Sequence, residues 1–177
     1  MPVIDPVPLS DLPEELFAIV KRGRESGMLS STVPAQIWAH CPEAASAWLL
    51  ALENLHVHGR LGNRLRELVR LKIASITKCK ACQVARKTDE VTEEDLACLT
   101  WSDSRFTPKE QAALRYAELF AFDYFAIDNE VHELLKRNFT TEETVELHMY
   151  CALMLAGGRM TYVQRGYPDQ LDDDGDA

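Results

Sequence analysis

The sequence lacks any run of apolar residues long enough to cross a membrane, which takes about 20 in succession. Its first residues, "MPVIDPVPLSDLPEEL", also lack the basic segment and the apolar core of a secretory signal peptide. We therefore expect no membrane association and a place in the cytoplasm, where thiols are kept mostly reduced.

Positive charge is scarce as well. The chain has 19 Lys and Arg against 28 Asp and Glu, and its formal net charge is −9. General nucleic-acid binding needs a basic surface, so we expect no nucleic-acid partner. Part of the acidic excess lies in "DQLDDDGDA", residues 169–177, which we predict to be a solvated, disordered tail.

Common cofactor motifs are also missing. The chain has no Gly-x-Gly-x-x-Gly, no phosphate-binding P-loop and no Cys-x-x-Cys-His, so we expect no nucleotide, flavin or haem cofactor.

No linker rich in Gly, Ser or Pro interrupts the chain ahead of the acidic tail. This absence predicts a single domain over residues 1–168.

Strand signals are lacking too, because no segment alternates strictly between apolar and polar residues and no Asn-Gly or Asp-Gly turn joins apolar runs. Apolar residues recur at helical spacing instead, which predicts an all-α protein of about seven or eight helices. The last of these helices is expected to end, kink or pack closely near Gly157–Gly158. Helix starts or caps are indicated at Ser10 or Asp11, Pro42, Asn63, Thr92, Thr107 and Thr140.

What the sequence does have is a Cys-x-x-Cys pair, Cys79 and Cys82, within "KCKACQVAR". In a helix that begins near Lys78 their Cα atoms would lie about 5 Å apart, within the range of disulfides. The helix N-terminus and nearby cations would favour the thiolate, which is the nucleophile. A redox pair, a metal clip and two inert buried thiols all remain open. Zinc needs about four ligands, and no second pair completes a set, so we expect no metal.

Glu67 and Arg86 flank this pair in sequence. If the chain turns near Lys78 and folds back as a helical hairpin, these two side chains could face each other with Cys82 between them. Arg86 would then stabilise a Cys82 thiolate or hold an anionic substrate. Alternatively, Arg86 would form an ion pair with Glu67 that fixes the hairpin.

The stretch "RLRELVRLKIASITKCKACQVAR" resembles the signature of the carboxymuconolactone decarboxylase family, in its alkylhydroperoxidase-D-like branch. That branch carries Glu, eleven residues, Cys-x-x-Cys, three residues and then His; Glu67, Cys79 and Cys82 match it. The resemblance implies an all-α fold around a helical hairpin and a homo-oligomer, often a trimer or hexamer. It also implies reduction of peroxides by a dithiol/disulfide cycle in which the Glu and the His relay protons.

The sequence departs from this signature at the relay His, whose place is taken by Arg86. Arginine is effectively always protonated, so it cannot shuttle a proton near neutral pH. We consider His148 and His58 as substitute bases, with Tyr150 beside the former.

Our leading hypothesis is a thiol-dependent oxidoreductase. Cys82 or Cys79 attacks a peroxide or disulfide, the other resolves the intermediate, and a thiol reductant regenerates the pair. The resemblance favours Cys82 as the attacking residue, with Glu67 as a proton acceptor or orienting partner. Two alternatives stay open: an enzyme that acts on a small carboxylated or lactone substrate with Arg86 as the anion clamp, and a non-enzymatic oligomeric redox sensor.

Overall fold

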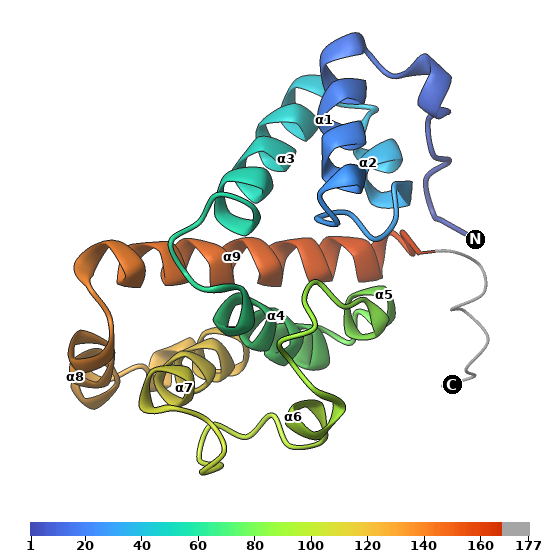
Figure 1. Ribbon diagram of the computed structural model, residues 1–177. Helices are drawn as coiled ribbons and strands as arrows, with labels where there is room; N and C mark the ends of the chain where they lie inside the picture. The colour runs from blue at the N-terminus through green and yellow to red at the C-terminus, as the bar shows by residue number, and fades with distance from the viewer. Residues whose placement is uncertain (168–177) are drawn as a thin grey trace. The chain divides into compact units, whose positions relative to one another are not determined.

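A computed structural model describes residues 1–167, and within them the chain is entirely helical, with nine α-helices and two short 3-10 helices (Figure 1). The predicted all-α class is confirmed, with more helices than the seven or eight expected. The acidic tail predicted for residues 169–177 lies outside the described residues. None of the described helices is long and apolar enough to cross a membrane.

The described chain divides into two compact units, one of residues 1–58 and 159–167, the other of residues 59–158. The single domain expected over residues 1–168 stays a prediction. Both cysteines of the Cys-x-x-Cys pair, Glu67, Arg86 and His148 belong to the second unit. His58 closes the first segment of the other unit.

Three α-helices form most of the first unit: α1 (Glu14–Glu25), α2 (Val33–Trp38) and α3 (Pro42–His56). The start of α3 at Pro42 is confirmed, whereas a first helix starting at Ser10 or Asp11 is wrong. A 3-10 turn, η1 (Leu9–Asp11), occupies that place, and Pro13 forces Leu12 into extended backbone before α1 can begin. The core consists of Leu12, Leu16, Ile19, Val20, Ala35, Ala39, Ala45 and Leu49.

The second unit contains α4 (Asn63–Thr77), α5 (Lys80–Val84), α6 (Glu93–Ala97), α7 (Pro108–Phe122), η2 (Tyr124–Ala126) and α8 (Asn129–Asn138). Helix α9 (Thr141–Val163) belongs to this unit as far as residue 158. Helix α4 packs along α7. Leu68 and Leu71 of α4 and Leu114 of α7 share a buried apolar cluster with Val91 and Phe106 from the connecting segments. This packing holds α4, which carries Glu67, rigidly in the unit.

Local capping signals describe several helix starts well. Thr92 and Thr107 form reciprocal capping boxes with Asp95 and Glu110, as expected. The pair Thr140 and Glu143 makes the same two hydrogen bonds. The cap predicted at Asn63 is wrong by one residue: Gly62 is the N-cap, and the Asn63 side chain accepts a hydrogen bond from Arg66 instead.

Helix α9 continues past Gly157–Gly158 to Val163, so the glycines do not end it. The sequence left an end, a kink or close packing open at these glycines, and the structure shows close packing. A Cβ atom at Gly158 would lie 2.8 Å from the Thr77 hydroxyl oxygen, which is closer than real Cβ atoms approach. The missing side chain therefore lets α9 lie against the last residue of α4, next to the cysteine turn.

Candidate functional site

The candidate site begins where α4 ends. Lys78 follows Thr77 with φ 53° and ψ 27°, the left-handed conformation that commonly terminates a helix. The chain reverses there and α5 begins at Lys80. The predicted turn near Lys78 is confirmed, and in Figure 1 α5 lies beside the end of α4.

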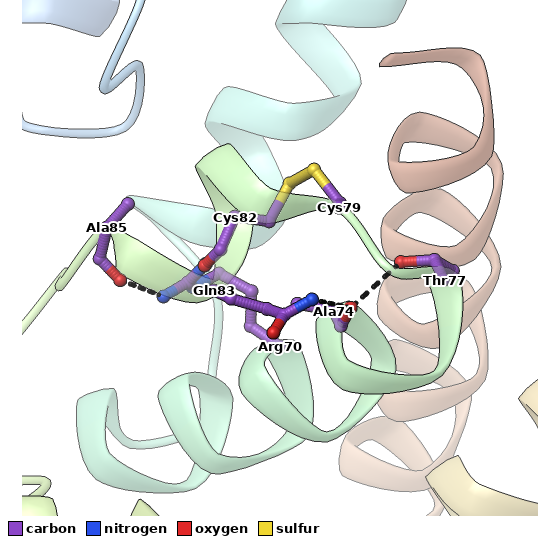
Figure 2. Close-up of a disulfide and its surroundings, with 7 residues drawn as sticks. All are labelled: Arg70, Ala74, Thr77, Cys79, Cys82, Gln83 and Ala85. Atoms are coloured by element: carbon purple, nitrogen blue, oxygen red, sulfur yellow. Dashed lines mark hydrogen bonds between the residues drawn. A yellow bond between two sulfur atoms is a disulfide. The ribbon is translucent and has the colours of Figure 1, made fainter. Parts of the chain in front are cut away.

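Cys79 occupies the N-cap position of α5, and Cys82 lies three residues on. The two are joined by a disulfide (Figure 2). Their Cα atoms are 5.2 Å apart, close to the spacing of about 5 Å expected for residues three apart in a helix. Their environments differ, since Cys79 is fully buried and Cys82 is half-buried. A molecule arriving from solvent therefore meets Cys82 first.

The second helix of the predicted hairpin, α5, is much shorter than expected. Helix α5 ends at Val84 and Ala85 is extended, so Arg86 does not lie on a helix. Its guanidinium binds Glu93, with Nη2 3.2 Å from Oε1. The alternative in which Arg86 pairs with Glu67 is therefore wrong, because the chain leaves the helical path before it reaches Arg86.

Glu67 is paired with Arg70, which lies on the same face of α4 at the i,i+3 position. The two side chains form a bidentate ion pair, with Arg70 Nε and Nη2 each 2.7 Å from a carboxylate oxygen. Oε1 of Glu67 also accepts a hydrogen bond from the Lys87 backbone N–H at 3.0 Å. Both side chains are buried, with 1% of Glu67 and 6% of Arg70 exposed.

Arg70 also reaches the cysteine helix. Its Nη1 donates to the Cys82 carbonyl at 2.5 Å and its Nη2 to the Ala85 carbonyl at 2.7 Å (Figure 2). Sequence reasoning missed Arg70. The signal was a Glu-x-x-Arg pair within the apolar face of α4, a spacing that places both charges together on a helix.

The side chains considered as substitute bases, His148, Tyr150 and His58, lie at different places in the chain. His148 is stacked on Tyr116, with ring centroids 4.7 Å apart, and burial lowers the pKa of the imidazole, which favours its neutral form. The buried His148 Nε2 has no hydrogen-bond partner among residues 1–167. Burial raises the pKa of the Tyr150 phenol, which also lies within electrostatic range of Arg70 and Glu67. His58 is exposed in the first unit.

A metal-binding cluster would need several ligands in one place. Among residues 1–167, no three His, Cys, Asp or Glu side chains are grouped closely enough to hold a metal ion.

Comparisons with known proteins show which protein family and which solved structures this chain is similar to. The sequence profile of the carboxymuconolactone decarboxylase family matches residues 42–119. This segment covers α3, α4, the cysteine turn and most of α7. A search of curated proteins gives no match.

Solved structures resemble nearly the whole chain. The apo debrominase Bmp8 matches with a TM-score of 0.79 at 16% identity, over 94% of this chain and 92% of the other. A cysteine-to-alanine variant of Bmp8 in complex with 2,3,4-tribromopyrrole matches with a TM-score of 0.78 at 15% identity, over 92% and 89%. At these identities the likeness establishes the fold.

A third solved structure is the alkylhydroperoxidase AhpD core, an uncharacterized peroxidase-related protein from Ralstonia eutropha JMP134. It matches with a TM-score of 0.71 at 19% identity, over 94% of this chain and 93% of the other. The overall helical fold is thus shared by all three. Together with the matching segment 42–119, it makes this chain similar to proteins of the carboxymuconolactone decarboxylase family, with an alkylhydroperoxidase-like fold.

Proposed function

We propose that this protein is a thiol-dependent oxidoreductase in which Cys79 and Cys82 cycle between dithiol and disulfide. The observation that carries the proposal is the bonded pair at the start of α5, with one cysteine buried and the other half-buried. A half-buried thiol suits the attacking role, and a buried neighbour within bonding distance suits the resolving role. The thiol reductant, a homo-oligomeric assembly and a cytoplasmic setting belong to the same proposal.

With a hydroperoxide, the Cys82 thiolate attacks one peroxide oxygen and the O–O bond breaks. This step gives an alcohol, after proton uptake, and a sulfenic acid on Cys82. The Cys79 thiol then attacks the Cys82 sulfur, releasing water and forming the disulfide. An external dithiol returns two electrons and two protons by thiol–disulfide exchange.

Proton transfer is where this site differs from the branch it resembles. Arg86 stands in place of the relay His, and Glu67 is engaged by Arg70 and by the Lys87 N–H. Substrates whose leaving group departs readily as an anion would depend least on a relay. A disulfide with an acidic thiol fits that description, because a leaving thiol of lower pKa departs faster.

Reductive dehalogenation is a second candidate, favoured by the likeness to the debrominase Bmp8. A dithiol can supply the two electrons: one aryl bromide and two thiols give the arene, bromide, a proton and the disulfide. Bromide release from a brominated pyrrole, measured with an ion-selective electrode, distinguishes this reaction from peroxide or disulfide reduction.

The test is turnover of a hydroperoxide and of an aromatic disulfide with dithiothreitol as reductant. We expect consumption of at least one of them, and its loss in Cys82→Ser. If protein with intact thiols consumes neither substrate above background, the proposal is refuted. If the disulfide nevertheless forms reversibly, the non-enzymatic redox sensor is the function that remains. Turnover of a lactone retained in the Cys79→Ser, Cys82→Ser variant would favour the carboxylated-substrate enzyme.

A further inference from the structure

Helix α5 is too short to be stable by itself. It spans five residues, Lys80–Val84, whereas isolated helices are marginal even at about 12 residues. Its last carbonyl groups lack partners within the helix and must be satisfied from elsewhere. The geometry of Cys82, which lies in this helix, therefore depends on contacts that hold α5 from outside.

Two arginines provide those contacts. Nη1 of Arg86 donates to the carbonyls of Gln83, Val84 and Ala85 at 2.5, 3.1 and 3.2 Å. The Arg86 side chain is 34% exposed, and that of its partner Glu93 is 81% exposed. Water competes for such bonds, and exposed ion pairs contribute little to stability.

Arg70 reaches the same helix from α4 and is buried. Its Nη1 donates to the Cys82 carbonyl, its Nε donates to Glu67, and its Nη2 donates to both Glu67 and the Ala85 carbonyl. Charge-assisted hydrogen bonds are stronger than neutral ones, and burial protects them from competition with water. Arg70 therefore connects α4, which is fixed by its packing on α7, with the backbone of Cys82 itself.

Glu67 has little capacity left for proton transfer. Oε2 accepts from Arg70 Nε, and Oε1 accepts from both Arg70 Nη2 and the Lys87 N–H. A carboxylate offers about four lone-pair sites, and three are taken. Its contacts are those of an anchor that fixes the guanidinium in one orientation.

We propose that Arg70, anchored by Glu67, is a positioning residue that holds Cys82 against Cys79, and that Glu67 serves this purpose instead of relaying protons. The proposal deepens the proposed dithiol/disulfide function and rests on it, but it is tested without any substrate. Holding the two thiols close raises their effective concentration, which favours the disulfide over the dithiol.

The experiment measures the equilibrium of the Cys79–Cys82 disulfide in the full-length protein against reduced and oxidised dithiothreitol. Two electrons and two protons pass between the added dithiol and the pair. Because Cys41, Cys98 and Cys151 are not in the disulfide, the linked fraction is read by mass spectrometry of the peptide that contains residues 79 and 82.

We expect Arg70→Met to reduce the equilibrium constant for disulfide formation about tenfold, the effect of losing a charge-assisted hydrogen bond. Arg70→Lys keeps the charge but cannot form the bidentate pair, so we expect it to restore the constant only in part. We expect Glu67→Gln to shift the constant in the same direction, and the double variant Glu67→Gln, Arg70→Met to shift it no further than Arg70→Met.

The matched control is Arg64→Met. Arg64 is another arginine of α4, and its hydrogen bonds to Asp95, Glu110 and the Glu90 carbonyl are all made outside the cysteine helix. This variant should lose stability and keep the wild-type disulfide constant. If Arg70→Met does not fold, Arg70→Lys and Glu67→Gln carry the test.

A wild-type disulfide constant in the folded Arg70 and Glu67 variants would overturn the proposal. So would a Glu67→Gln variant that keeps the wild-type constant while its turnover falls to background, since that is the behaviour of a proton relay. Absence of turnover in the wild-type protein would refute the proposed function, but the disulfide equilibrium would still show whether Arg70 positions Cys82.

Discussion

At the scale of single residues, the site carries Arg86 at the position where the signature it resembles has a histidine. Arg86 binds Glu93 and three backbone carbonyls, so its contacts fix the end of α5. Arg70 does the same from the buried side and occupies Glu67. In the proposed function, the two arginines hold α5 in place without a Glu–His relay.

The Arg86→His variant tests this interpretation. It restores the residue type found in the relay position, yet Glu67 would still be bound to Arg70, so we expect no gain in hydroperoxide consumption at a fixed dithiol concentration. General acid–base catalysis typically contributes about 100-fold or more. A gain approaching that size would show that Glu67 is available for proton transfer after all.

Much of the site could be predicted at this scale. Cys79, Cys82 and Glu67 follow from their type and spacing, and the turn at Lys78 from the helix-breaking run around it. The partner of Glu67 could not be found in the same way, because Arg86 and Arg70 are both plausible until the length of α5 is known. That length depends on contacts made after the chain has folded.

At the scale of elements, helix α6 depends on an ion pair with α4. Asp95 forms the capping box of α6 and also accepts hydrogen bonds from Arg64, at 2.8 and 3.3 Å. The hydrogen bond from Arg64 lowers the pKa of Asp95 from 3.8 to about 2, against the opposing effect of burial. The ionised form is thus favoured in the folded protein.

This shift predicts a pH dependence of stability. A carboxyl whose pKa is depressed on folding stabilises the protein above its unfolded pKa, and this contribution is lost as the pH falls from 3.8 towards about 2. The loss should amount to about 2 kcal/mol. Urea unfolding across this pH range measures it, and Asp95→Asn should lack this component. An unchanged pH profile in that variant would contradict the assignment.

The contact between α9 and the end of α4 gives a second prediction at this scale. Replacing glycine by alanine inside a helix normally stabilises it by about 1 kcal/mol. Gly158→Ala should instead destabilise the protein, by about 1–3 kcal/mol, because the added methyl group would overlap the Thr77 side chain. Chemical denaturation measures the difference.

The variant Gly158→Ala, Thr77→Ala provides the control, since it removes the Thr77 hydroxyl group, which the new methyl group would approach most closely, and the Thr77 methyl group. The two effects should therefore not add, and the double variant should be more stable than Gly158→Ala. A stabilising Gly158→Ala would mean that α9 and α4 do not meet as closely as described.

Helix starts were predictable because capping boxes are local signals, as at Thr92, Thr107 and Thr140. The extent of α9 was not, since Gly157–Gly158 carries the local signal of an ending, and packing against Thr77 overrides it. The start of α1 was misplaced because the extended backbone imposed by Pro13 takes precedence over the cap signal at Ser10 and Asp11.

At the scale of the whole molecule, the disulfide lies in the unit of residues 59–158. It closes a very short loop, for which the entropic contribution to stability is about 2 kcal/mol. Reduction should therefore lower the thermal midpoint of the protein modestly, with no effect in the Cys79→Ser, Cys82→Ser variant. If the chain is the single domain predicted from its sequence, calorimetry should show one transition that shifts as a whole.

The central claim is that Cys79 and Cys82 are the redox-active pair of the protein, which cycles between dithiol and disulfide. Its most direct test adds one equivalent of oxidising substrate to the fully reduced protein and follows substrate and thiols together. The claim predicts that one substrate molecule is consumed for every two thiols lost, and that residues 79 and 82 become linked. Consumption of substrate with both thiols intact, or loss of thiols elsewhere in the chain, would contradict it.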